Sequence, residues 1–137
     1  MKVTQYSEGC GALISDIQLA DLSVTQLADL RTIFAKHGLL FFRDQDFSPQ
    51  DHLQFAQRFG SIVVNKFFRA TEQFPEIAEV RKEKEQQSNI GGGWHTDHSY
   101  DDIPAMGSIL VARKLPETGG DTQFANLANA YEALSPQ

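Results

Sequence analysis

The chain has 137 residues and a formal net charge of −6, with 41% hydrophobic and 22% charged residues. These values suit one globular domain, and an acidic chain without a basic run is a poor candidate for binding nucleic acid. No apolar run approaches the length of a membrane span, and no apolar stretch follows Lys2 as it would in a signal peptide. We therefore expect a cytoplasmic protein that has neither nucleic acid nor membrane as a partner.

Helix and strand signals alternate through the first part of the chain. Ser23 and Gln26 have the spacing of a capping box, and Gly38 follows the helical apolar pattern as a stop signal. Ser48-Pro49 supplies a second cap with a proline at the first helical position. The predicted elements, in chain order, are a strand within residues 11–19, a helix from 23 to 38, a strand at 39–42 and a helix from 48 to 60.

Strands predominate among the predictions for the rest of the chain. Short runs rich in Ile, Leu and Val, bounded by turn residues, are typical of strands. The three consecutive glycines at 91–93 fit neither a helix nor a strand, so residues 88–93 are expected to form a loop. The predicted elements are strands at 62–64, 77–80, 106–112 and 121–125, a turn at 116–120, and a helix from 127 to 134.

His95 and Asp97 follow the glycine loop and are separated by a single residue. In an extended segment alternate side chains point to the same side, so one imidazole and one carboxylate can converge on a metal ion. Such a pair is two thirds of the 2-His-1-carboxylate triad that holds non-haem Fe(II) and leaves positions open for cosubstrates. A His-x-Asp pair also occurs by chance in surface loops, and on spacing alone this plainer interpretation stays open.

Further segments occur in the order of a known family. These segments are residues 37–45, 55–60, 94–97, 104–110 and 115–122, the last reading Leu-Pro-Glu-Thr-Gly-Gly-Asp-Thr. With these motifs the sequence resembles the taurine dioxygenase-like (TauD/TfdA) iron- and 2-oxoglutarate-dependent oxygenases over nearly its whole length. The resemblance implies an α+β, mainly β fold: part of a double-stranded β-helix, or jelly roll, with flanking helices.

The resemblance also implies an activity and roles for individual residues. His95 and Asp97 would bind Fe(II), and Thr122 would donate its hydroxyl to a carboxylate of 2-oxoglutarate, with O₂ as the other cosubstrate. Family members that act on taurine carry a His and a Tyr where Asn and Phe stand here, which implies hydroxylation of a small organic substrate other than taurine. The positions that would contact this substrate are Asn65, Phe68 and Tyr100.

The sequence departs from the family in one respect, because it contains neither the family's downstream His ligand nor the Arg that pairs with 2-oxoglutarate. We therefore expect residues 1–137 to be a single, truncated N-terminal portion of the domain. Such a portion would be inactive alone and able to self-associate through open sheet edges. Two alternatives remain: an inactive remnant or binding module, and a two-metal hydrolase. The hydrolase motif resembles residues 95–98 but needs further His ligands where the glycines 91–93 stand.

Overall fold

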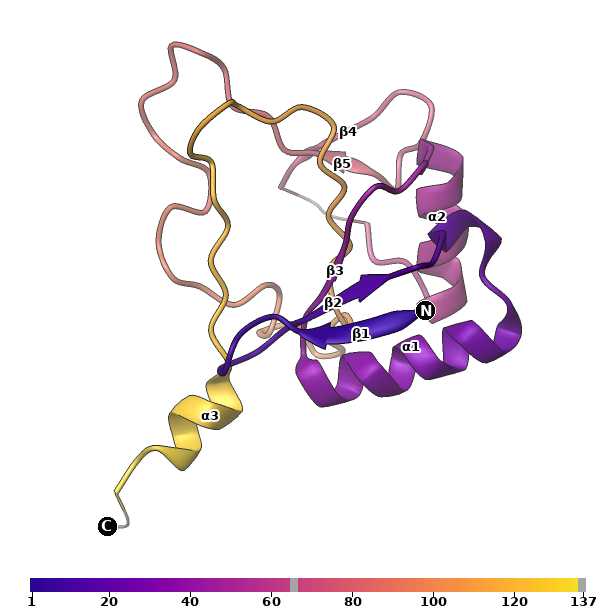
Figure 1. The fold of residues 1–137 in the computed structure, drawn as a ribbon. Helices are drawn as coiled ribbons and strands as arrows, with labels where there is room; N and C mark the ends of the chain where they lie inside the picture. The colour runs from indigo at the N-terminus through magenta and orange to yellow at the C-terminus, as the bar shows by residue number, and fades with distance from the viewer. Residues whose placement is uncertain (65–66, 136–137) are drawn as a thin grey trace. The chain divides into compact units, whose positions relative to one another are not determined.

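A computed structural model describes residues 1–64 and 67–135, and the chain divides into two compact units. One unit combines Met1–Asp46 with Ala112–Gln137, and the other is Phe47–Val111. The two small sheets and the helices confirm the α+β part of the expected fold class. The elements in Figure 1 are β1 (Lys2–Gln5), β2 (Ala12–Ser15), the short 3-10 helix η1 (Leu19–Asp21), α1 (Val24–His37), β3 (Leu40–Phe42), α2 (Pro49–Phe59), β4 (Arg69–Ala70), β5 (Ala78–Glu79) and α3 (Leu127–Glu132).

The first unit is built on a three-stranded sheet in the order β1–β2–β3. β1 pairs antiparallel with β2, whereas β2 pairs parallel with β3, with Leu13 opposite Phe41. Parallel neighbours need a crossover connection, and α1 supplies it between β2 and β3. Ala12 and Ile14 on one face of β2 are 0% and 1% exposed, and Leu30 of α1 is 0% exposed. The most deeply buried side chains of this unit therefore come from β2 and from the crossover helix α1.

The two longer helices begin and end where the sequence predicts. The Ser23 hydroxyl accepts a hydrogen bond from the Gln26 N–H at 3.1 Å, and the Gln26 side chain accepts one from the Ser23 N–H at 2.9 Å. Gly38 ends α1 in the left-handed conformation, with φ of 69°, which a glycine adopts without steric cost. Ser48 caps α2 in the same reciprocal way, with Pro49 at the first helical position.

The second unit contains α2 and a short two-stranded ribbon. The Phe47 ring lies just before α2 and packs against Phe55, with the ring centroids 5.9 Å apart, and Phe55 in turn packs against Phe59 at 5.0 Å. Phe47 and Phe55 are both buried, so this aromatic stack anchors the helix. β4 pairs antiparallel with β5, and Arg69 stands opposite Glu79.

Several strand predictions are wrong. Residues 62–64, 106–112 and 121–125 are irregular, and the strand predicted at 77–80 is reduced to the two residues of β5. A strand is held by its ladder to a neighbour, and within residues 1–64 and 67–135 no strand pairs with those three segments. The β propensity of their Ile, Leu and Val residues is too weak to order the backbone without such a neighbour. β1 is paired with β2 but is not predicted from the sequence. All four of its side chains are exposed, so no buried face marks it as a strand.

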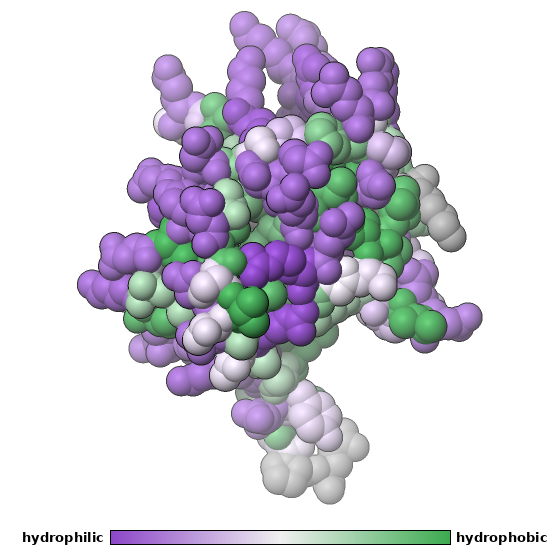
Figure 2. Space-filling view, turned by 90° about the vertical axis from the view of Figure 1, so that its right-hand side faces the viewer, coloured by the Kyte–Doolittle hydropathy of each residue, from purple (hydrophilic) through white to green (hydrophobic). Residues whose placement is uncertain are grey.

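Apolar and hydrophilic residues are interspersed over the face of the molecule that Figure 2 shows. None of the helices in the described part of the chain is long and apolar enough to cross a bilayer. Large apolar side chains are nevertheless well exposed, at 60% to 87%, along residues 103–134. They are Ile103, Met106, Leu110, Leu115, Leu127, Tyr131 and Leu134.

Candidate metal centre

The glycine-rich loop shapes the backbone that leads to His95. Gly91 has φ of 66°, in the left-handed region, and this turns the chain so that the imidazole of His95 lies against it. A Cβ atom built on Gly91 would stand 3.2 Å from the His95 Cε1 atom, tighter than most van der Waals contacts. The loop thus leaves room for the ring because position 91 has no side chain.

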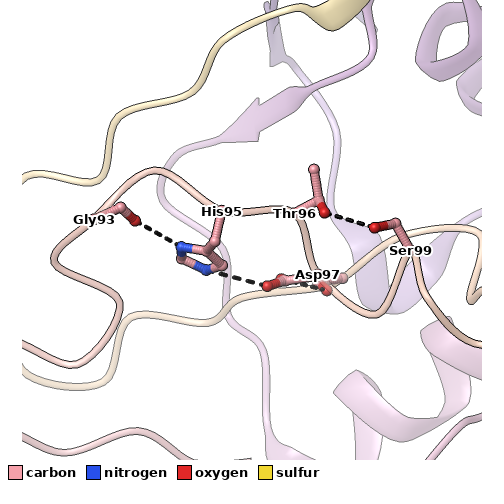
Figure 3. A network of polar contacts seen from close by, with 6 residues as sticks. Gly93, His95, Thr96, Asp97 and Ser99 are labelled. Carbon is pink, nitrogen blue, oxygen red and sulfur yellow. Dashed lines mark hydrogen bonds and ion pairs between the residues drawn. The ribbon is translucent and has the colours of Figure 1, made fainter.

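His95 and Asp97 converge, as their spacing predicts. The His95 Nε2 atom lies 3.3 Å from the Asp97 Oδ1 atom, and Figure 3 shows both side chains on the same side of the backbone. The intervening Thr96 points away from them, and its hydroxyl lies 2.6 Å from the Ser99 hydroxyl. The alternation expected of an extended segment is therefore present at residues 95–97.

A backbone carbonyl fixes which nitrogen of His95 faces the carboxylate. The His95 Nδ1 atom lies 2.8 Å from the Gly93 carbonyl oxygen. A carbonyl oxygen can only accept, so Nδ1 donates in this contact and Nε2 is the nitrogen that is turned toward Asp97. An Nδ1–H donated to a backbone carbonyl is a common way to orient a metal-binding histidine.

The two facing atoms are both electron-rich, so their approach calls for a cation between them. A proton on Nε2 would make an ion pair of this contact, and a metal ion would make it a ligand pair. Ligand atoms about 2.1 Å from one metal ion and at right angles to each other are about 3.0 Å apart. The observed 3.3 Å is close to that value, and the side chains, 57% and 62% exposed, are open to an incoming ion. The donor set therefore fits a divalent metal ion.

Asp97 has a further partner that the sequence did not indicate. The Ser108 hydroxyl donates a hydrogen bond to the other carboxylate oxygen, Oδ2, at 3.4 Å. No sequence signal could have revealed this contact, because it joins residues eleven positions apart through irregular backbone. Within the described ranges, no cluster of three or more His, Cys, Asp or Glu side chains is placed to hold a metal ion. His95 and Asp97 thus supply two donors of a site that needs more.

His98 belongs to a separate pair in the same loop. Its Nδ1 atom lies 3.3 Å from the Asp101 Oδ2 atom, and its backbone has φ of 50°. The His98 ring also has aromatic neighbours, with centroids 5.8 Å from that of Phe67 and 5.6 Å from that of Tyr100. These contacts engage the His98 side chain with Asp101, Phe67 and Tyr100.

The other predicted site residues stay predictions. Asn65 lies outside the described residues. Phe68 is half-buried immediately before β4, and Tyr100 is 70% exposed beside His98. Thr122 is exposed in irregular backbone of the unit that contains residues 112–137. Phe67, the neighbour of Phe68, is not among the predicted site residues, and its ring lies against that of His98.

The chain is similar in sequence to several curated proteins over most of its length. The chain is 30% identical over 127 residues to the (S)-phenoxypropionate/alpha-ketoglutarate-dioxygenase of Sphingobium herbicidovorans, covering 90% of this chain and 44% of the relative. It is 30% identical over 146 residues to the alpha-ketoglutarate-dependent sulfonate dioxygenase of Saccharomyces cerevisiae, covering 98% and 35%. It is 36% identical over 126 residues to an alkylsulfatase of Acinetobacter baylyi, covering 90% and 39%. The chain therefore spans less than half the length of these curated relatives.

The chain also resembles a solved structure and matches a family model. A crystal structure from Burkholderia xenovorans, assigned to the alpha-ketoglutarate-dependent taurine dioxygenases, superposes with a TM-score of 0.52 at 28% identity. The superposition covers 59% of this chain and 31% of that one. The model of the family described as "Taurine catabolism dioxygenase TauD, TfdA family" matches residues 2–137. The match covers all the motifs that lead to, form and follow the His95–Asp97 pair, and the chain belongs to the TauD, TfdA family.

Proposed function

We propose that this chain provides the iron-binding loop of an Fe(II)- and 2-oxoglutarate-dependent dioxygenase. The observation that carries the proposal is the 3.3 Å approach of the His95 Nε2 atom to the Asp97 Oδ1 atom. Family membership favours a metal ion over a lone proton between these two atoms. One imidazole and one carboxylate are two of the three ligands in the 2-His-1-carboxylate arrangement that holds Fe(II) in non-haem oxygenases and leaves further positions open.

Each residue of the centre has a separate task. His95 offers the Nε2 lone pair, and the Gly93 carbonyl holds its ring by Nδ1. Asp97 offers a negatively charged oxygen, which balances part of the charge of the cation. When bound, iron and 2-oxoglutarate supply the oxidation of a substrate C–H bond by O₂. We assign to Thr122 a hydroxyl donor for a carboxylate of 2-oxoglutarate, a charge-assisted hydrogen bond of the stronger kind. The domain we propose for this chemistry is a jelly roll.

For the substrate we propose a small organic anion other than taurine. Relatives of this chain are named for phenoxypropionate and for sulfonates, both of which are anions. Phe68 and Tyr100 would form an apolar wall for the organic part, and Asn65 a polar contact. Tyr100 fits this role because its ring is well exposed in the loop that follows Asp97.

The proposal is tested by titrating the chain with Mn(II), a paramagnetic substitute for Fe(II) that is stable in air. The chain has four histidines, His37, His52, His95 and His98, whose ring resonances report on four places at once. We expect Mn(II) to broaden the His95 ring resonances at a lower concentration than those of His37 and His52. Asp97→Asn should remove this preference, because the amide carries no charge and is a weaker ligand.

The second His–Asp pair in the loop is a matched control. His98 and Asp101 face each other at the same 3.3 Å, so Asp101→Asn removes an equivalent charge near the same glycines. We expect Asp101→Asn to leave the broadening of His95 unchanged. Equal broadening of all four histidines in the unmodified chain, or loss of the effect in Asp101→Asn but not in Asp97→Asn, would contradict the proposal.

A further inference from the structure

Among the residues that the structure describes, Ser108 is the side chain beyond residues 93–97 that donates a hydrogen bond to this pair. Its hydroxyl donates to Asp97 Oδ2 at 3.4 Å, while Oδ1 of the same carboxylate faces His95 at 3.3 Å. The two oxygens of Asp97 thus have different tasks. Oδ1 is directed to the place where a cation would lie, and Oδ2 is engaged by a neutral hydroxyl.

This division matters because a carboxylate can bind a metal ion through one oxygen or through both. A donor on Oδ2 resists rotation of the carboxylate group and occupies lone pairs that would otherwise be available to the ion. Asp97 is then restrained to bind through Oδ1 alone. One coordination position that two-oxygen binding would fill stays open for a cosubstrate.

His95 and Asp97 are each oriented by a partner of a different kind. His95 is held by a backbone carbonyl, which substitution of side chains cannot remove. Asp97 is held by a side-chain hydroxyl, which a single substitution removes. The other hydroxyl pair of the loop, Thr96 with Ser99, is directed away from both His95 and Asp97.

We propose that Ser108 is a positioning residue for the metal ligand Asp97, holding its carboxylate for binding through one oxygen. This inference rests on the proposed metal centre and adds a residue to it. At 3.4 Å the contact is longer than the roughly 2.6 Å of a strong hydroxyl–carboxylate bond. We therefore expect an effect near the lower end of the 10- to 100-fold change in metal affinity that is typical when an outer partner of a ligand is lost.

The experiment compares Mn(II) affinity, read from the broadening of the His95 ring resonances, in four forms of the 137-residue chain. They are the unmodified chain, Ser108→Ala, Ser108→Thr and Ser99→Ala. Ser108→Ala should weaken binding about tenfold, whereas Ser108→Thr keeps the hydroxyl and should restore most of the affinity. Ser99→Ala deletes a serine hydroxyl in the same loop that touches neither ligand, and it should leave the affinity close to that of the unmodified chain.

The outcomes separate this inference from the proposed function. If Mn(II) shows no preference for His95 in the unmodified chain, the metal centre itself is refuted and the role of Ser108 with it. If the preference is present but Ser108→Ala binds as tightly as Ser99→Ala, the metal centre stands and only the role of Ser108 is overturned. A loss of affinity in Ser108→Ala that Ser108→Thr does not restore would assign the effect to backbone packing and would also overturn it. Because Ser108 is exposed, the amide spectrum away from the loop should be the same in all four forms.

Discussion

The surroundings of His95 are mostly backbone. Gly91 leaves space beside the ring, and the Gly93 carbonyl accepts its Nδ1 proton. The glycines of this loop are therefore part of the candidate site, although their sequence pattern indicates only an irregular turn. From the sequence, the convergence of His95 with Asp97 could be predicted because it depends on the local alternation of an extended backbone. The Ser108 contact could not, because it depends on how a later segment returns to the loop.

At this scale we predict that Gly91→Ala weakens metal binding more than Gly93→Ala. A methyl group at position 91 would meet His95 Cε1 at 3.2 Å, and an L-residue at φ of 66° is strained by roughly 1–2 kcal/mol. At position 93 a Cβ atom would have no heavy atom within 4 Å, and the backbone there has no positive φ. Mn(II) titration of both variants is the measurement. Equal affinities would show that the ring does not depend on the space at Gly91.

At the scale of the element, helices follow their local signals and strands do not. α1 and α2 form where their caps predict, because each cap is completed by residues three positions away. β2 and β3 are also predicted correctly, and each has a paired neighbour. The segments 106–112 and 121–125 have comparable strand patterns but no neighbour among the described residues. The sequence of a segment thus predicts its β propensity. Whether the segment forms a strand also depends on hydrogen bonding to a neighbouring strand that is distant in the chain.

The cap of α2 leads to a prediction about pH. The hydrogen bonds from the Ser48 side chain, and then from its backbone, lower the pKa of Asp51 below its ordinary value of 3.8. A carboxyl group whose pKa is lowered on folding stabilises the fold above its unfolded pKa, and this contribution is lost as the pH falls through the folded value. We expect Ser48→Ala to raise the pKa of Asp51 toward 3.8 and to reduce helix stability near neutral pH more than at acidic pH.

The check is an NMR titration of the Asp51 side-chain carboxyl in both forms. If the titration midpoint of Asp51 is the same with and without the Ser48 side chain, the reciprocal cap does not exist in solution.

Self-association of the whole molecule stays a prediction, but exposed apolar side chains replace open sheet edges as its expected cause. The segments 106–112 and 121–125, which the sequence predicts as strands, are irregular, so neither presents a strand edge to a second chain. Exposed apolar side chains are a different cause of association, and they are frequent along residues 103–134. Leu127 and Tyr131 stand one helical turn apart on α3 and are 68% and 76% exposed.

We predict that the chain associates as its concentration rises and that Leu127→Gln with Tyr131→Gln shifts it toward the monomer. Sedimentation equilibrium over a range of concentrations is the measurement. Val24→Gln is the matched control, because Val24 is 82% exposed on α1 and lies outside the segment 103–134. A chain that stays monomeric at every concentration would contradict the prediction, and so would an equal shift in the Val24→Gln control.

The arrangement of the first sheet has a consequence for the order in which the molecule is made. β1, β2, α1 and β3 all lie within Lys2–Phe42, and every strand pair of that sheet is formed inside this stretch. Contacts that are close in sequence lose little entropy when their loops close, and chains fold from the N-terminus as they leave the ribosome. A ribosome has therefore already supplied each strand that the described residues contribute to this sheet when it has yet to add the glycine loop, His95 and Asp97. The loop that we propose for metal binding is synthesised onto a chain that already contains the three paired strands β1, β2 and β3.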